Sequence, residues 1–166
     1  PPPRGNLKGG GAPETAPKPK RDPLLTQATW ELLWLILHHP EYGNQLSEII
    51  DYEWININST TGKILSRLLA ELREGMIDSV NQIENIIDSV QERQLLADIH
   101  SRELSVEEPT KQIVFCLERL RRNFVETQIK NLEQKIINSD PESQIRLMRE
   151  RKEILRKVAQ PLELAL

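Results

Sequence analysis

The clearest hydrophobic pattern in the chain lies at residues 26–39, TQATWELLWLILHH. Trp30, Leu33, Trp34 and Leu37 recur at the i, i+3, i+4, i+7 spacing that places side chains on one face of an α-helix. Further leucine and isoleucine residues widen that face until little of the helix is polar. A helix that is apolar almost all round is typically buried, so the pattern predicts a helix at the centre of a bundle.

Six further segments have helical character, and four of them begin near a serine that fits a capping position. Each serine stands three residues before Glu or Gln, which is the spacing of a capping box. The four pairs are Ser79–Gln82, Ser89–Glu92, Ser105–Glu108 and Ser139–Glu142. The expected helices span about 42–51, 59–75, 79–88, 89–103, 106–138 and 139–158, with an irregular connection at 52–58. No segment alternates apolar and polar residues as a half-buried strand does, so the predicted fold class is all-α.

The longest segment, about 106–138, carries two apolar stripes rather than one. The first stripe contains Ile113, Leu117, Leu120 and Phe124, and the second contains Val125, Ile129, Leu132 and Ile136. The second is one residue out of phase with the first, a rotation of about 100° on an α-helix. We therefore expect the first half of this helix to pack on the bundle. The second half should pair with the final helix as a two-helix hairpin, through Ile145, Met148, Leu155 and Val158. A single bundle with a curved long helix is the alternative.

Proline and glycine set the first 23 residues apart from the rest of the chain. This segment holds seven of the eleven prolines and four of the seven glycines, but only one large aliphatic residue, Leu7. It cannot bury enough apolar surface to offset the entropy of ordering it, so a disordered linker is predicted. We expect the chain to belong to a larger protein with a further region before Pro1. The expected organisation is a linker at 1–23, a helical bundle at 24–124 and a helical hairpin at 125–166.

Charge divides the folded part in a similar way. The formal net charge is −3, yet residues 41–110 carry 14 acidic and 5 basic side chains, whereas 111–158 carry 12 basic and 7 acidic ones. Such asymmetry can mark a partner surface, although a solvated helix face produces the same pattern. Glu150 and Glu153 interrupt the basic surface of the final helix, and the overall pI is about 5.7. Direct binding of nucleic acid is therefore a secondary alternative.

The residues that usually carry chemistry are few and scattered. Cys116 is the single cysteine and lies on an apolar stripe, which favours a buried structural thiol over a nucleophile. His38 and His39 point about 100° apart on a helix, and His100 is distant in the sequence, so no metal site is expected. No glycine-rich phosphate loop or nucleophile motif is present, and no apolar run approaches the ~20 residues of a membrane span. We expect no catalytic residue, no cofactor, no small-molecule substrate and no membrane contact, hence no enzyme in this chain.

The predicted layout and the opening of the bundle resemble one known family. A basic Pro/Gly-rich linker precedes a bundle, a long helix and a hairpin, and the bundle opens with Glu31-Leu32-Leu33…Leu35-Ile36-Leu37-His38-His39-Pro40-Glu41. This arrangement resembles the C-terminal helicase-binding domain of bacterial DNA primases, over about 24–166. The N-terminal domain of the replicative helicase shares the architecture and is the main alternative. The linker precedes the bundle here and the chain ends soon after the hairpin, which favours the primase domain.

The resemblance implies a protein-interaction domain that docks on the hexameric replicative DNA helicase, in the cytoplasm and at the replisome. The zinc-binding and catalytic parts of the parent would lie before Pro1. The hairpin would make the main contact with the helicase, and the bundle would modulate helicase activity. The expected contact residues are Ile137, Ile145, Leu147, Met148, Arg149, Ile154 and Leu162. Packing within the hairpin is the alternative role of each of them.

Overall fold

The computed structural model describes residues 23–164 and residue 166, so the expected linker lies outside the described residues except for Pro23. In chain order the elements are α1 (Pro23–His38), the 3₁₀ helix η1 (Pro40–Tyr42), α2 (Gly43–Ile49), η2 (Tyr52–Trp54), α3 (Thr60–Arg73), η3 (Val80–Ile86), α4 (Val90–Ser101), α5 (Pro109–Ile137) and α6 (Pro141–Ala159). No strand occurs among these residues, and the all-α prediction is confirmed.

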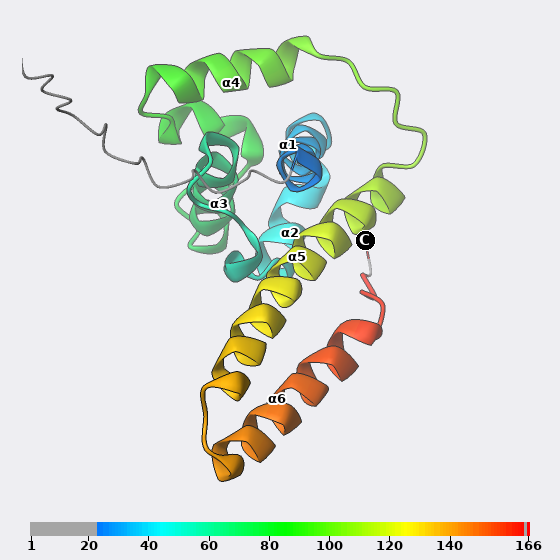
Figure 1. The fold of residues 1–166 in the computed structure, drawn as a ribbon. Helices are drawn as coiled ribbons and strands as arrows, with labels where there is room; N and C mark the ends of the chain where they lie inside the picture. Colours follow the sequence, from blue (N-terminus) through cyan, green and yellow to red (C-terminus); the bar gives the residue numbers. More distant parts are fainter. Residues whose placement is uncertain (1–22, 165) are drawn as a thin grey trace, which may run out of the picture.

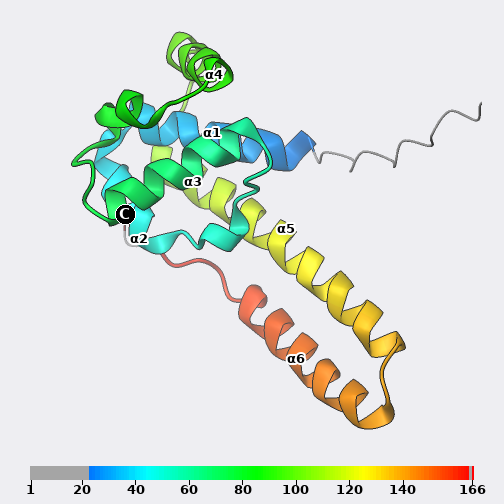
Figure 2. The same cartoon turned by 90° about the vertical axis from the view of Figure 1, so that its left-hand side faces the viewer.

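Helices α1 to α4 and the first half of α5 form a bundle, from which the rest of α5 projects with α6 as an antiparallel arm (Figures 1 and 2). The apolar helix α1 lies in its centre and contacts α3, η3 and α5. Leu32, Leu33, Leu35 and Ile36 are fully buried in it. The two stripes of α5 behave as expected, because its first half contacts α1 and its second half lies along α6.

Helix α4 lies across one end of the bundle and is joined to α5 by an extended segment at 102–108 (Figure 1). Two tryptophans of α1 hold this end in place. The indole Nε1 of Trp34 donates to the carbonyl of Arg102, 2.8 Å away, at the end of α4. The Arg102 guanidinium stacks on Trp30, 5.4 Å from the ring centroid. These contacts satisfy a helix-terminal carbonyl that has no partner within its own helix.

The expected capping pairs have different outcomes. Ser89 and Glu92 form a full capping box at the start of α4, as predicted. Ser79 instead begins the 3₁₀ helix η3, where its side chain accepts from the N–H of Asn81. The other two pairs do not cap helices, because proline begins both α5 and α6 and the cap positions therefore fall on Glu108 and Asp140. Asp140 rather than Ser139 therefore caps α6, and α5 begins without a side-chain cap.

Arginine side chains close other helix ends. Arg73 of α3 donates to the carbonyls of Ser47 and Ile50 at the end of α2, and stacks over Tyr52 at 4.3 Å. Arg67 of α3 donates to the carbonyl of Ile86, at 2.5 Å, at the end of η3. Helix C-termini leave carbonyls without intrahelical partners, and a cation there also interacts favourably with the helix dipole. Helix α3 thus fixes its neighbours through polar contacts as well as apolar packing.

The capping carboxylate of Glu92 gives a pH-dependent prediction. Hydrogen bonds from the N–H of Asp88, and secondarily of Ser89, lower the pKa of Glu92 below its ordinary 4.5, against the opposing effect of desolvation. Because the folded state prefers the ionised form, this stabilisation is complete above about pH 5.5 and is lost as the pH falls through the lowered pKa. Glu92→Gln should cost about 1 kcal/mol of unfolding free energy at pH 7 and less at pH 3, where part or all of the ionised form is lost. Urea unfolding of both proteins at the two pH values measures this. An equal cost at both values would contradict it.

Candidate partner-binding hairpin

Helices α5 and α6 of the hairpin contact each other through a narrow face, which we call the inner face. Leu132 is its buried residue on α5, at 6 % exposure. On α6, Gln144 donates to the carbonyls of Ile136 and Ser139, at 2.9 and 3.1 Å. Two helical turns further along α6, Arg151 pairs with Glu133 at 3.1 Å. These contacts turn the face of α6 that carries Gln144 and Arg151 toward α5.

The predicted pairing face of α6 is therefore wrong in three of its four residues. Ile145, Met148 and Leu155 are exposed, at 55, 57 and 40 %. The half-buried apolar residues are instead Leu147, Ile154 and Val158, which share the inner face with Gln144 and Arg151. Both sets have helical periodicity. The set that faces α5 is fixed by the start of α6 at Pro141 and by the contacts of Gln144 with α5.

The exposed residues form a surface along α6 that we call the α6 stripe: Ile145, Met148 and Leu155. On a helix of 3.6 residues per turn it lies about 90° from the inner face. A row of cations, Arg149, Lys152 and Arg156, runs beside it at the same helical spacing. Arg156 pairs with Glu153, whereas Arg149 and Lys152 form no ion pair with any described residue. At the tip of the hairpin, Ile137 adds an apolar side chain that is 74 % exposed.

The seven expected contact residues thus fall into three groups. Ile137, Ile145, Met148 and Arg149 are exposed on the hairpin. Leu147 and Ile154 lie on the inner face and are half-buried, so packing against α5 is their main role. Leu162 is not on the hairpin, because it follows α6 and packs against the core of the bundle. Leu155, assigned to pairing from the sequence, joins the exposed group instead.

The residues after α6 return to the bundle. Leu162, Leu164 and Leu166 are partly buried against its core (Figure 2 shows the path of this segment). At the point of return, Arg121 of α5 donates from one nitrogen, Nη2, to the carbonyls of Lys157, Val158 and Gln160, at 3.0, 3.0 and 2.7 Å. These carbonyls lie at the end of α6, and that of Lys157 also accepts from the backbone N–H of Gln160. Arg121 therefore ties the base of α6 to α5, and no sequence motif had indicated it.

Removing this contact should loosen the base of the hairpin. Arg121→Ala removes a side-chain donor from three carbonyls, of which that of Lys157 keeps the N–H of Gln160. We therefore expect a loss of about 1 kcal/mol of local stability and hydrogen exchange at 157–164 about fivefold faster. Arg122→Ala is the matched control, because Arg122 is exposed and donates to no carbonyl of α6. Exchange mass spectrometry of both variants gives the comparison. Equal rates in the two variants would mean that the three hydrogen bonds do not hold this segment.

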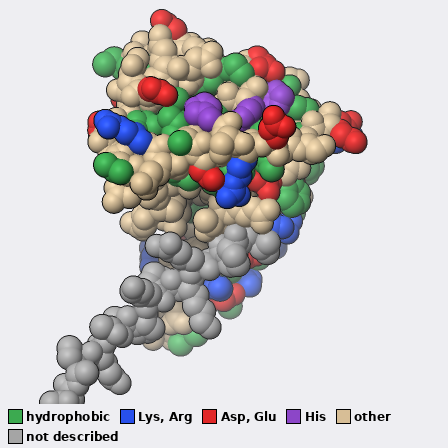
Figure 3. All heavy atoms as spheres, turned by 90° about the horizontal axis from the view of Figure 1, so that it is seen from above, with side chains coloured by type: hydrophobic (Ala, Val, Ile, Leu, Met, Phe, Trp, Pro, Cys, Tyr) green, Lys and Arg blue, Asp and Glu red, His purple; other side chains and the backbone are tan. Residues whose placement is uncertain are grey.

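The histidines are closer together than the sequence indicated. All three lie at one end of the bundle, where the last turn of α1 meets α4, and Figure 3 shows them grouped on that surface. The ring centroids of His38 and His100 are 6.3 Å apart. Among the described residues, no three His, Cys, Asp or Glu side chains are placed to hold a metal ion together.

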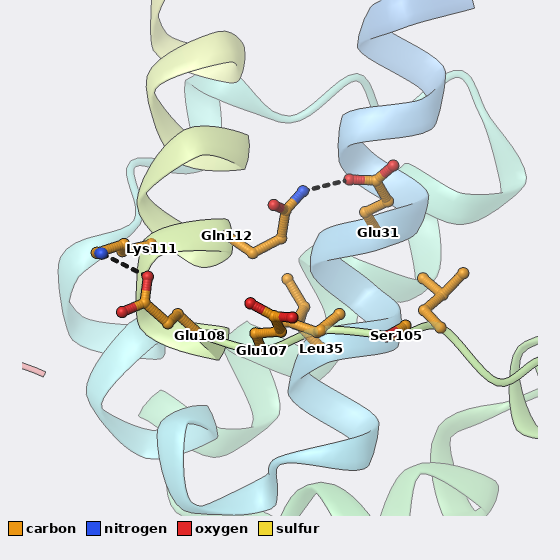
Figure 4. Close-up of a pocket in the computed structure, with 9 residues that line it drawn as sticks. Glu31, Leu35, Ser105, Glu107, Glu108, Lys111 and Gln112 are labelled. Carbon is orange, nitrogen blue, oxygen red and sulfur yellow. Dashed lines mark hydrogen bonds and ion pairs between the residues drawn. The ribbon is translucent and has the colours of Figure 1, made fainter.

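The cleft between α1 and the start of α5 has a volume of about 500 Å³ and is lined in part by Glu31, Leu35 and Glu107 (Figure 4). Glu31 is engaged with the bundle, because it accepts from Gln112 at 2.8 Å and from the thiol of Cys116 at 3.8 Å. Burial, and then the Glu31 carboxylate, raise the pKa of Cys116 to about 12. The thiol therefore stays protonated at neutral pH, whereas a nucleophilic cysteine needs the thiolate.

Comparisons of the chain with protein-family models, with curated proteins and with solved structures gave no match. In the part of the chain that the structure describes, no helix is both long and apolar enough to cross a membrane.

Proposed function

We propose that this chain is the helicase-binding domain of a bacterial DNA primase and that the hairpin docks on the replicative helicase. The observation that carries the proposal is the α6 stripe, which is exposed on a projecting arm beside a row of cations. The Glu31–Glu41 segment that resembles the primase domain supports it. The leucines of that segment supply the centre of the bundle.

The chemistry of recognition follows from the side chains. Ile145 and Met148 are the apolar anchors, and together they can supply several kcal/mol when a partner covers them. Arg149 and Lys152, free of ion pairs with the described residues, orient a partner and speed its approach. The matching surface on the helicase is therefore an apolar groove with acidic residues along one edge.

In this proposal the chain contributes binding rather than catalysis. Synthesis of the RNA primer belongs to another region of the parent protein. By docking on the hexameric helicase, the hairpin places that region at the unwinding fork. Because the bundle holds the base of α6 through Arg121 and the leucines after α6, the arm keeps a defined direction relative to the bundle.

Sedimentation of the chain with purified bacterial replicative helicase tests the proposal. We expect the two proteins to sediment together, and the association to weaken only modestly with salt because its anchors are apolar. Separate sedimentation would contradict it. If the chain does not sediment with the helicase but does sediment with a primase interaction domain, the chain is the helicase N-terminal domain instead.

The cation row gives single-stranded nucleic acid as the second candidate partner. That function requires an affinity that falls steeply with salt, since each phosphate contact releases counterions. Titration of a labelled single-stranded oligonucleotide at low and at moderate salt distinguishes the nucleic-acid function from the helicase-binding function. Tight binding at low salt, with no binding to the helicase, would favour the nucleic-acid function.

A further inference from the structure

The end of the bundle where α1 meets α4 holds an arrangement that the hairpin function does not use. His38 is the last residue of α1, and His100 lies in the last turn of α4. They are 62 positions apart in the sequence, yet their ring centroids are 6.3 Å apart, and both side chains are exposed. We propose that His38 and His100 form a two-histidine site for a late first-row divalent metal ion, Cu²⁺, Ni²⁺ or Zn²⁺.

The orientation of His38 is fixed in a manner that suits a ligand. Its Nδ1 lies 2.9 Å from the carbonyl oxygen of Trp34. A carbonyl can only accept, so Nδ1 carries the proton and Nε2 of the neutral ring keeps its lone pair. Histidines that bind metals commonly donate their other nitrogen to a backbone carbonyl in this way. The ring also stacks on Trp34, at 4.0 Å and 16°, which holds its plane.

The separation of the two rings is compatible with a shared ion. With a metal–nitrogen bond of about 2.0–2.1 Å, two imidazoles on one ion have centroids roughly 5 to 6.5 Å apart. The observed 6.3 Å lies at the upper end of that range. Because His38 is held by Trp34, the adjustment to a shared ion falls on the exposed His100 side chain.

Neighbouring groups determine the kind of site. His39 lies edge-on to Trp34 and beside Glu41, with Nδ1 3.7 Å from Oε1, so it is engaged separately. Glu84 and Arg93 line a cavity with His100, but no third ligand is grouped with the pair among the described residues. Water completes the coordination sphere. Two imidazoles bind Cu²⁺ more tightly than Ni²⁺ or Zn²⁺, following the usual order of these ions.

The consequence is a crosslink between two helix ends. An ion bound by both residues joins α1 to α4 near the hydrogen bond from Trp34 to the Arg102 carbonyl. Because the unfolded chain does not hold the two imidazoles together, binding stabilises the folded state.

Calorimetric titration of the full chain with NiCl₂, at slightly alkaline pH and without an affinity tag, tests this site. The wild-type protein should bind one ion, and at a Ni²⁺ concentration of about ten times Kd its Tm should rise by about 3–6 °C. His38→Gln and His100→Gln should each weaken binding by at least about tenfold, because each leaves one imidazole. His39→Gln should leave the affinity within about twofold of wild type, since it alters the same cluster without removing a ligand.

Loss of the His38 ring also removes the stack on Trp34, so the exposed His100 is the deciding position. Circular dichroism establishes that the His100→Gln protein is folded before the titration. If wild type binds no Ni²⁺, or if the His100→Gln protein binds it as tightly as wild type, the proposed site is wrong. Neither result bears on helicase binding by the hairpin.

Discussion

Replacing Ile145 and Met148 together by glutamate is expected to weaken helicase binding by about 100-fold or more. The two side chains are 55 and 57 % exposed, so the chain alone loses little packing. In the proposed complex they are the central apolar anchors, and a loss of about 2.7 kcal/mol of binding free energy corresponds to a factor of 100 in Kd. Glutamate would also be repelled by the acidic edge proposed for the partner. Fluorescence anisotropy with labelled variant and purified helicase measures the change.

The chain offers a matched control for this double substitution. Ile57 and Met76 are the same two residue types, are 59 and 71 % exposed, and lie on the bundle rather than on the hairpin. Ile57→Glu with Met76→Glu should leave helicase affinity within about threefold of wild type, because surface substitutions away from contacts have small effects. If both double variants lose affinity equally, the α6 stripe is not the specific contact.

Leu132→Asp is expected to open the hairpin while leaving the bundle folded. The side chain of Leu132 on α5 is buried against α6 at 6 % exposure. An unpaired carboxylate at this position costs several kcal/mol of stability. An isolated helix of the length of α6 is marginal in water without tertiary packing. Amide exchange over 141–156 should therefore accelerate by about 100-fold or more, whereas exchange in α3 should change little.

Ile137→Asp controls for introducing the same charge on the same helix, because Ile137 is 74 % exposed. It should leave exchange in α6 near the wild-type rate. If Leu132→Asp accelerates exchange in α3 as much as in α6, a single cooperative unit spans the bundle and the hairpin. The boundary expected near residue 124 would then be wrong.

The sequence was sufficient to predict the α-helices and that α5 has two packing partners, although 79–88 forms a 3₁₀ helix and the connection at 52–58 contains another. Helix α1 was predicted from an apolar pattern so dense that only burial accommodates it, and the phase shift near Phe124 predicted that α5 has two packing partners. Both rest on local periodicity, which a single sequence displays directly. The capping box at Ser89 was also predicted. Helices α5 and α6 begin at Pro109 and Pro141, positions that suit proline, although Ser105 and Ser139 do not cap them.

The candidate sites depend on contacts between segments that are distant in the sequence, which hydrophobic periodicity does not reveal. Two alternative stripes on α6 have the same spacing, and only the contacts of Gln144 and Arg151 with α5 identify the inner one. Three of the four residues assigned to pairing were therefore exposed. Similarly, His100 approaches His38 because α4 folds across the end of α1. Such proximity between distant segments arises from tertiary packing.

Calorimetric titration of the chain into purified hexameric bacterial replicative helicase tests the central claim most directly. The proposal predicts saturable binding with a Kd of about 10 μM or tighter, and a negative heat-capacity change because apolar surface is buried. The heat should disappear when the Ile145→Glu, Met148→Glu protein is used. Absence of binding at tens of micromolar, with both proteins folded, would contradict the assignment of this chain as a helicase-binding domain.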